Sequence, residues 1–503
     1  MAHDSYDLVV IGGGINGAGI AADASARGLR VLLAEAGDLG GATSSASSKL
    51  VHGGLRYLEQ YAFRLVRESL AEREILLAKA PHIVWPLSFV LPYVEGMRPA
   101  FMLRAGLFAY DHLAARHALG SSHRVNLSND PVGRCLRADI GFGFRYWDCW
   151  VDDARLVVLN ALAAREAGAT VLTRTPVISL RIHNNEQWIV ALRAAGGVRE
   201  VSARCVVNAA GPWVGAVAQL VTGGHYGRAP RLRLVKGSHI VVRRVSSSND
   251  ALIFQHRDGR VVFALPFEEN FTLIGTTDVP HDGNMGDVAI TTDEIEYLLN
   301  LANQFFRVPL APSDVVWSFA GVRALDDDGS ADASSVTRDY RLDLDVSLGA
   351  PLLHVIGGKI TTYRRLAEQV VDKLARHFPA LKPSTARSLH LPGGDVGPEG
   401  FDAWLQDAYR AYPRFPQEMV RRLARRYGTR MSVLLGNAHT SADLGAKFGA
   451  GLTAREVAYL RDTEWAMTAD DVLWRRTKTG LHLSAIERHS AGAGIANILG
   501  QRS

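Results

Sequence analysis

The stretch DLVVIGGGINGAGIAADASARGLRVLLAE (7–35) decides the first part of the fold. A short apolar run, Leu8–Ile11, leads into a cluster of glycines. The small residues that follow, Ala18–Ala26, predict a helix, and a second apolar run, Val31–Ala34, predicts another strand. The order strand, glycine turn, helix and strand is that of a Rossmann-like βαβ unit.

The glycines of this unit have the spacing Gly12-x-Gly14-x-x-Gly17, which is typical of dinucleotide binding. Gly12 permits the tight turn after the strand, and Gly14 lets backbone N–H groups approach a pyrophosphate. Gly17 allows the helix to pack closely on the strand. Glu35 ends the second strand, where a carboxylate can accept hydrogen bonds from the adenosine ribose. The motif predicts a dinucleotide site but does not separate NAD from FAD.

Two more glycine turns follow strand-like runs far along the chain. ARCVVNAAGPW (203–213) contains Gly211, and LLHVIGGKITTYR (352–364) contains Gly357 and Gly358. A cofactor that contacts three widely separated turns is long and bound internally. This favours FAD over a dissociable nicotinamide.

Composition excludes several other classes of protein. The chain has 503 residues, of which 47% are hydrophobic and 21% charged, as in ordinary globular proteins. A net charge of +5 over this length does not indicate a nucleic-acid partner. The three cysteines form no C-x-x-C pair, so neither a structural zinc site nor an iron–sulfur cluster is expected. No metal-ligand spacing is present. The first residues are polar and no apolar run reaches about 20 residues, so we expect neither a secretory signal nor a spanning helix.

The chain divides into a mixed core and a helical tail. Strand-like and helical patterns alternate from Asp7 to about Ala386. The segment LHLPGGDVGPEG (389–400) is rich in glycine and proline and is typical of a linker. Residues 401–503 show helical spacing of apolar residues.

With these blocks the sequence resembles the FAD-dependent, respiratory (aerobic-type) glycerol-3-phosphate dehydrogenases of bacteria. The serine-rich block that continues into HGGLRYLE is the most specific, because a general dinucleotide fold does not require it. The resemblance covers nearly the whole chain and rests on IGGGINGAGIAADA (11–24), ATSSASSKLVHGGLRYLE (42–59), DCWVDDARLV (148–157), KGSHIVV (236–242), IGTTDV (274–279), SFAGVRAL (318–325), TRDY (337–340), GGKITTYRRLAE (357–368), LGNAHTSADLG (435–445) and DDVLWRRTKTGL (470–481).

The resemblance implies a fold of the α/β plus α+β class. It contains a Rossmann-like FAD-binding domain of the glutathione-reductase/D-amino-acid-oxidase type, a sheet-based substrate domain and an all-α C-terminal domain. We place the FAD-binding domain at 1–90, 145–235 and 320–386, the substrate-binding domain at 91–144 and 236–319, the linker at 387–400 and the C-terminal domain at 401–503.

The resemblance also implies the activity: sn-glycerol 3-phosphate is oxidised to dihydroxyacetone phosphate by hydride transfer to flavin N5, and the electrons pass to a membrane quinone. The alternative is an oxidase for glycerol 3-phosphate or for an amino acid that uses oxygen as acceptor. The arginines described below exceed what one carboxylate needs, which disfavours the amino-acid version. A non-catalytic flavoprotein or a nucleic-acid-binding module is the remaining alternative, and the interspersed charges of the tail disfavour the latter.

Candidate site residues fall into three groups. Guanidinium groups suit a phosphate dianion because they bind bidentately and stay charged, and the side chains that match family substrate positions are Arg56, Tyr57, Arg323 and Arg338. His52 and His239 are the candidate bases, and the sequence leaves open which one acts. Arg323 and Lys359 are further catalytic candidates, Lys359 because a cation at a helix start can stabilise negative charge. The expected FAD contacts are Gly12, Gly14, Gly17, Glu35, Thr43, Ser44, Ser45, Ser47, Gly211, Gly357, Gly358, Lys359 and Thr361.

A quinone-reducing enzyme without a spanning helix must touch the bilayer. The segment 81–110 carries aromatic residues and arginines beside an apolar face, as an interfacial segment does, although buried core is the other interpretation. The expected location is therefore the cytoplasm, with peripheral binding to an anionic surface at the inner face of the cell membrane. A homodimer is compatible with the resemblance.

Overall fold

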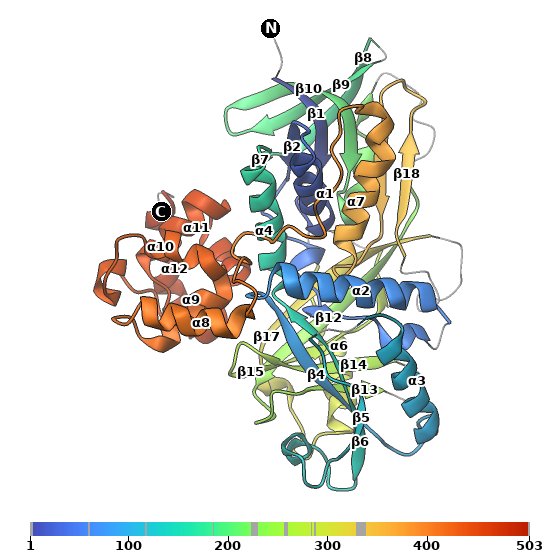
Figure 1. Cartoon of the computed structure of the whole chain (residues 1–503), viewed down its shortest axis with the longest axis vertical. Helices are drawn as coiled ribbons and strands as arrows, with labels where there is room; N and C mark the ends of the chain where they lie inside the picture. Colours follow the sequence, from blue (N-terminus) through green and yellow to red (C-terminus); the bar gives the residue numbers. More distant parts are fainter. Residues whose placement is uncertain are drawn as a thin grey trace.

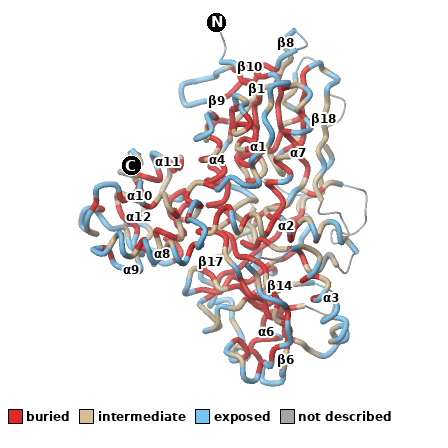
Figure 2. The backbone as a smooth tube through the Cα atoms, in the orientation of Figure 1, coloured by how far each residue is buried: buried red, intermediate tan, exposed pale blue. Residues whose placement is uncertain are grey.

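The computed structural model describes residues 4–58, 61–115, 118–184, 186–222, 230–255, 260–282, 284–285, 288–327 and 339–500. Two β-sheets lie end to end along the long axis of the molecule, and the helices of the last hundred residues form a separate lobe at one side (Figure 1). Figure 2 shows that buried residues run through both sheets and through the centre of the helical lobe.

Among the described residues the first sheet has nine strands, and β1 (Asp4–Ile11) lies near its centre. β1 pairs in parallel with β2 (Val31–Ala34) and β10 (Gly197–Asn208), and β10 pairs in parallel with β19 (Leu352–Ile356). Parallel neighbours end at the same edge of a sheet, so the predicted glycine turns after β1, β10 and β19 lie side by side. The other strands of this sheet are β7 (Thr170–Leu172), β8 (Val177–His183), β9 (Gln187–Ala194), β11 (Val221–Thr222) and β18 (Arg341–Asp345).

Helix α1 (Ile15–Ala26) packs between α4 (Asp153–Glu166) and α7 (Tyr363–Leu374) against this sheet (Figure 1). Side chains alternate along a strand. Leu8 and Val10 of β1 accordingly join the core shared with the helices, whereas Val9 and Ile11 join the core on the opposite face.

In the part of the chain that the structure describes, the second sheet has ten strands, and α2 (Phe63–Lys79), α3 (Ala100–His112) and α6 (Thr292–Asn303) lie beside it (Figure 1). Helix α6 begins with a capping box between Thr291 and Glu294. The strands are β3 (Leu50–Val51), β4 (Val84–Pro92), β5 (His123–Asn126), β6 (Phe142–Val151), β12 (Leu232–Arg243), β13 (Ala251–Gln255), β14 (Val261–Phe267), β15 (Phe271–Gly275), β16 (Val279–Pro280) and β17 (Val315–Asp326). A short helix, α5 (Val214–Ala218), follows β10.

The sheets adjust the domain limits inferred from sequence. Those limits put residues 50–51, 84–90, 145–151, 232–235 and 320–326 in the FAD-binding domain, whereas these residues belong to strands of the second sheet. The division into a FAD-binding domain, a substrate domain, a linker and a C-terminal domain is our proposal, with these strand residues moved to the substrate domain.

The C-terminal helices surround a core of their own and are α8 (Gly400–Ala411), α9 (Gln417–Tyr427), α10 (Met431–Leu435), α11 (Ala454–Glu464) and α12 (Ala485–Leu499). The preceding chain is held by Lys79 at the end of α2. The Lys79 ammonium donates hydrogen bonds to the carbonyl oxygens of Ala386, at 2.6 Å, and Leu389. No helix among the described residues is both long and apolar enough to cross a bilayer.

A buried histidine, His82, makes the unfolding free energy depend on pH. His82 is fully buried between α2 and β4, and neither ring nitrogen has a hydrogen-bond partner among the described residues. Burial, together with Arg155 and Arg425, lowers the pKa of His82 to about 3 from its usual 6.5. As the pH falls below 6.5, His82 therefore takes up a proton in the unfolded chain but stays neutral in the native chain.

We expect His82 to lower the unfolding free energy by up to about 1.4 kcal/mol per pH unit below about pH 6.5. Urea midpoints of wild type and His82→Gln between pH 7 and pH 5 check this, because the variant should lose part of the acid sensitivity. Parallel curves for the two proteins would contradict it.

Candidate active site

The glycine turn after β1 is shaped by close backbone contacts. Gly12 has a φ of +106°, and a Cβ there would lie 2.7 Å from the carbonyl oxygen of Ala209. A Cβ at Gly17 would overlap the carbonyl oxygen of Gly12. Gly14 precedes the first turn of α1, where a Cβ would meet only Ser44 Oγ at 3.1 Å. The helix start is therefore open to a bound phosphate group, which suits the positive end of the helix dipole.

Glu35 lies beside this turn. Its carboxylate accepts hydrogen bonds from the backbone N–H groups of Gly13, at 2.5 Å, and Gly37, at 2.6 Å. Burial raises the pKa of Glu35, although these two hydrogen bonds oppose the shift. The carboxylate is thus fixed beside the glycine turn, where a ribose would lie.

The serine-rich loop divides its contacts among three parts of the protein. Ser44, in the short helical turn η1 (Thr43–Ser45), accepts a hydrogen bond from the N–H of Ile15 at 3.0 Å and so lies at the start of α1. Thr43 Oγ1 donates to the carbonyl of Val322 on β17. Ser47 turns away and donates to Asp153 at 2.7 Å. Of these three side chains, Ser44 is the one placed at the glycine turn.

The other two glycine turns lie at the same edge of the first sheet. Gly211 follows β10 and has a φ of +56°, and Gly357 and Gly358 follow β19 with φ values of +78° and +104°. The Asn16 amide of α1 donates to the carbonyl of Gly357 at 3.1 Å, which ties the first turn to the third. Lys359 and Thr361 come next in the chain. The three turns lie at one edge of the sheet, and the space next to Gly14 and Gly211 is open. This arrangement fits an extended dinucleotide such as FAD.

His239 and Arg323 lie on one face of the second sheet. In the antiparallel pair of β12 and β17, His239 lies opposite Phe319, and Val235 lies opposite Arg323. Directly opposed residues of such a pair, and every second residue along each strand, share a face. This face therefore carries a buried imidazole and a guanidinium.

His239 is held in a dry environment. Its Nε2 lies 2.9 Å from Ser48 Oγ, and its ring stacks on Phe319 with centroids 4.9 Å apart. Its Nδ1 is buried without a hydrogen-bond partner among the described residues. Burial, reinforced by Lys49 and Arg323, holds the pKa of His239 well below its usual value. The imidazole is consequently neutral at pH 7, as a base must be before it accepts a proton.

Arg323 forms an ion pair with Asp278, and its Nη2 donates to Thr276 Oγ1 at 3.2 Å. A Cβ at Gly237 would collide with this guanidinium. The side chain is about one quarter exposed, so a phosphate group can reach it.

The structure describes only some of the remaining predicted site residues. The backbone N–H of His52, just after β3, donates to Thr361 Oγ1 at 3.3 Å, so His52 lies beside the third glycine turn. Arg56 and Tyr57 belong to the short helical turn η2 (Leu55–Leu58), but their side chains are outside the described residues. Arg338 is outside the described residues altogether.

Two residues that sequence reasoning missed organise this region. Lys49 is 1% exposed, and its ammonium contacts both carboxylate oxygens of Asp153 at 2.8 and 2.9 Å. Asp153 also binds Ser47, so this carboxylate anchors the loop that carries the predicted FAD contacts. The adjacent acids of the DCWVDDARLV motif were the only available signal in the sequence, since their partners lie about a hundred residues away.

A cavity of about 400 Å³ adjoins this loop. It lies where η1 and β17 meet the C-terminal domain, and its lining includes Thr43, Ser45, Lys49, Trp317, Trp474 and Lys478.

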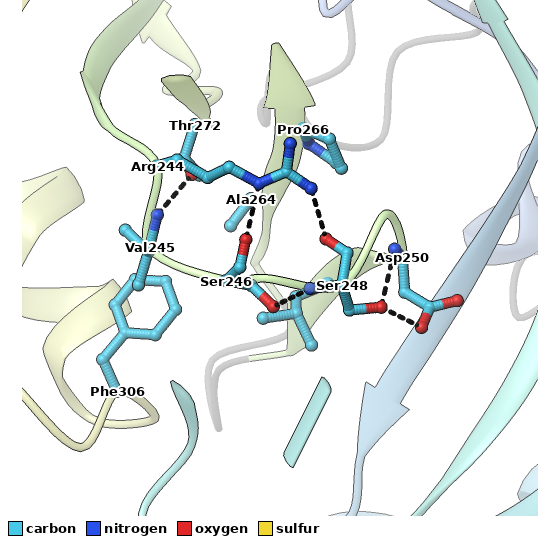
Figure 3. Close-up of a pocket in the computed structure, with 10 residues that line it drawn as sticks. Arg244, Val245, Ser246, Ser248, Asp250, Ala264, Pro266, Thr272 and Phe306 are labelled. Atoms are coloured by element: carbon cyan, nitrogen blue, oxygen red, sulfur yellow. Dashed lines mark hydrogen bonds between the residues drawn. The ribbon is translucent and has the colours of Figure 1, made fainter. Parts of the chain in front are cut away.

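A much smaller hollow of about 10 Å³ lies within the substrate domain (Figure 3). The Arg244 guanidinium fills one side and donates to the carbonyl oxygens of Ser246, at 2.7 Å, and Ser248, at 3.1 Å. Ser248 Oγ in turn donates to Asp250 at 2.6 Å. The space suffices for about one water molecule, so it is too small for a substrate or a cofactor.

Comparison with known proteins shows the family to which the chain belongs. Residues 7–364 match the family described as "FAD dependent oxidoreductase", and residues 384–502 match "C-terminal domain of alpha-glycerophosphate oxidase". The chain is 49% identical to D-erythritol 1-phosphate dehydrogenase of Brucella abortus, over 96% of each chain. It is 48% identical to aerobic glycerol-3-phosphate dehydrogenase of Escherichia coli, over 99% of each chain. The crystal structure of glycerol-3-phosphate dehydrogenase from Bacillus halodurans complexed with FAD has a TM-score of 0.76 and 28% identity, over 100% of this chain and 96% of that one.

Proposed function

Because the chain belongs to the FAD-dependent oxidoreductases, and carries the C-terminal domain found in alpha-glycerophosphate oxidase, we propose that it oxidises sn-glycerol 3-phosphate to dihydroxyacetone phosphate. The observation that carries this proposal is the common face of His239 and Arg323, a buried neutral base and an accessible cation beside the serine-rich loop. The high identity to the Escherichia coli enzyme over the full chain supports the choice of substrate.

When bound, FAD would supply the two-electron acceptor for oxidation of the substrate at C2. The protein then has three tasks. Arg323, with Arg56 and Arg338, binds the phosphate through charge-assisted hydrogen bonds. His239 accepts the proton of the C2 hydroxyl, and its Ser48 contact orients the ring. Lys359 stabilises negative charge on the substrate oxygen, and Tyr57 adds a neutral donor.

The substrate test is anaerobic reduction of the bound flavin, followed by its absorbance. Glycerol 3-phosphate should bleach the flavin, whereas glycerol and lactate at the same concentration should not. D-Erythritol 1-phosphate is the second candidate, because the Brucella abortus relative bears that name at 49% identity. Faster bleaching by the erythritol ester would replace the first substrate with the second, and bleaching by lactate alone would contradict both.

The base is identified by replacing each histidine. Loss of a general base typically costs about 10²–10⁴-fold in rate, and we expect this loss in kcat for His239→Ala, with a smaller change in KM. Because its pKa lies well below 6.5, the acid limb of the wild-type profile should lie below that pH. If His52→Ala instead removes the acid limb and His239→Ala keeps it, His52 is the base.

The electron acceptor in this proposal is a membrane quinone. Stopped-flow reoxidation of the reduced enzyme by a water-soluble ubiquinone analogue should outpace reoxidation by oxygen. The reverse order would make the protein an oxidase.

Within the segment 81–110, helix α3 is the part that we propose as the membrane contact. Residues 84–92 form β4 of the second sheet, where most side chains are buried and Phe89 is 1% exposed, so they offer little apolar surface to a bilayer. Helix α3 lies at the periphery (Figure 1), and Phe101, Met102 and Phe108 are 74%, 46% and 56% exposed. Exposed Arg104 on the same helix suits anionic headgroups. We infer peripheral binding through α3 to the inner face of the cell membrane.

Flotation with anionic liposomes checks this contact. Phe101→Asp and Phe108→Asp should each reduce the floated fraction. Ile486→Asp is the matched control, since Ile486 is 84% exposed but lies on α12. Leu107 is unsuitable because it is 2% exposed and belongs to a core. Equal flotation of all four proteins would exclude α3 as the contact.

A further inference from the structure

A short segment of the C-terminal domain, residues 470–478, contacts the loop between Glu35 and Lys49. Part of this segment, Asp471–Arg476, forms a π-helical turn, an uncommon shape that recurs at functional positions in proteins. Its side chains also form one wall of the 400 Å³ cavity.

The strongest contact is a buried ion pair between Arg476 and Asp38. Two parallel hydrogen bonds of 2.7 Å join the guanidinium to the carboxylate, and the side chains are 0% and 3% exposed. Arg475 adds a third contact to the same carboxylate at 2.5 Å. Arg476 is held in turn by the backbone carbonyl of Glu464, at 2.8 and 3.1 Å. A bidentate pair of this kind fixes direction as well as distance.

Asp38 lies in the loop between Glu35 and η1, both of which belong to the candidate FAD site. The N–H of Gly40 donates to the carbonyl of Gly13 at 3.0 Å, so this loop is hydrogen-bonded directly to the glycine turn. A shift of Asp38 would therefore move the backbone beside the dinucleotide.

A second contact acts on the other end of the same loop. Lys478 binds Asp152 at 2.7 Å, and the neighbouring Asp153 holds Lys49 and Ser47. The two adjacent acids at the start of α4 thus link the C-terminal domain to the serine-rich loop.

A third contact acts on the strand that carries Arg323. Trp474 stacks on Trp317 of β17, with ring centroids 4.8 Å apart and planes 19° from parallel. Trp317, Trp474 and Lys478, which take part in these contacts, also line the cavity.

Buried charges are costly to desolvate, and a buried ion pair adds less to stability than an apolar contact of similar size. A buried ion pair instead favours one specific arrangement of the two segments that it joins. If the C-terminal domain docks well only when the loop holds the shape that binds FAD, docking and FAD binding must strengthen each other by the same factor.

We propose that the C-terminal domain is a positioning element for FAD, acting through the Arg476–Asp38 pair on the loop between Glu35 and Lys49. This inference concerns FAD retention and is independent of the proposed substrate. Neither Arg476 nor Asp38 needs to contact the cofactor.

The test measures FAD release from the full-length holoenzyme after dilution, followed by the rise in free flavin fluorescence. Arg476→Gln should weaken FAD binding by about 5- to 150-fold, the usual range of coupling between two sites. Arg476→Lys keeps the charge but loses the bidentate geometry, and should weaken FAD binding less. It also serves as the test variant if Arg476→Gln does not fold.

The matched control is Arg430→Gln. Arg430 and Glu166 form another ion pair between the same two domains, but Glu166 lies at the end of α4 and not in the FAD loop. This variant should lower the unfolding midpoint without changing FAD release. If it weakens FAD binding as much as Arg476→Gln, or if both Arg476 variants bind FAD as wild type does, the pair only holds the domains together and the proposal is wrong.

Reciprocity provides a second readout. In wild type, FAD should slow proteolysis of the linker 387–400, because the cofactor tightens docking. In the Arg476 variant that folds, added FAD should give little protection. Equal protection in wild type and variant would overturn the coupling.

Discussion

Gly14→Val should give a folded protein that no longer retains FAD. The φ of Gly14 is −77°, which any residue adopts, and the nearest atom to an added Cβ is Ser44 Oγ at 3.1 Å. The backbone therefore tolerates the substitution. The branched side chain would nevertheless cover the start of α1, where backbone N–H groups face the pyrophosphate.

Losing two charge-assisted hydrogen bonds, at about 1.5–3 kcal/mol each, should weaken FAD binding by about 10²–10⁴-fold. The flavin-to-protein ratio after gel filtration measures this, and circular dichroism confirms the fold. Gly141→Val is a control, because no atom lies within 4 Å of a Cβ at that position. A yellow Gly14→Val protein with a full complement of FAD would show that the pyrophosphate lies elsewhere.

Arg323→Ala should raise KM for glycerol 3-phosphate about ten- to hundredfold, the cost of one charge-assisted contact of about 1.5–3 kcal/mol. Arg56→Ala should act in the same direction, with secondary losses in kcat for both. The expected split between KM and kcat follows because the phosphate is bound in the ground state as well as in the transition state.

Arg341→Ala is the matched control for Arg323→Ala. Arg341, on β18, also forms an ion pair with an aspartate of β17, Asp326. Its side chain is 44% exposed, and Asp326 points to the opposite face of β17 from Arg323 because side chains alternate along a strand. Arg341→Ala should leave both kinetic constants unchanged. Wild-type kinetics for Arg323→Ala and Arg56→Ala would place the phosphate site elsewhere.

The first βαβ unit could be predicted from sequence because its signals are local. The run Leu8–Ile11 lies within β1, and the run Val31–Ala34 coincides with β2. The predicted helix lies within α1. The parallel pairing of β1, β10 and β19 then explains why the three glycine turns meet. Apolar runs and glycine spacing carry this information because both reflect neighbours along the chain.

Other features could not be predicted because their partners are distant in sequence. Nothing in the spacing of residues links Lys49 to Asp153 or Asp38 to Arg476, so a charged residue in a loop suggests a solvated position. The segment 81–110 was ambiguous for a related reason. An apolar stretch with prolines suits an interface as well as a buried strand, and only the pairing of β4 with β6 decides that residues 84–92 are core.

The hydrogen bond between Asn16 and Gly357 spans 341 residues and has a consequence for synthesis on the ribosome. At about 5–20 residues per second, roughly 15 to 70 s separate the emergence of β1 from that of the third glycine turn. Throughout that interval the nascent chain exposes apolar strands that lack their final neighbours. FAD should accordingly be incorporated only near the end of translation, and a nascent chain arrested before Gly357 should aggregate in the absence of chaperones.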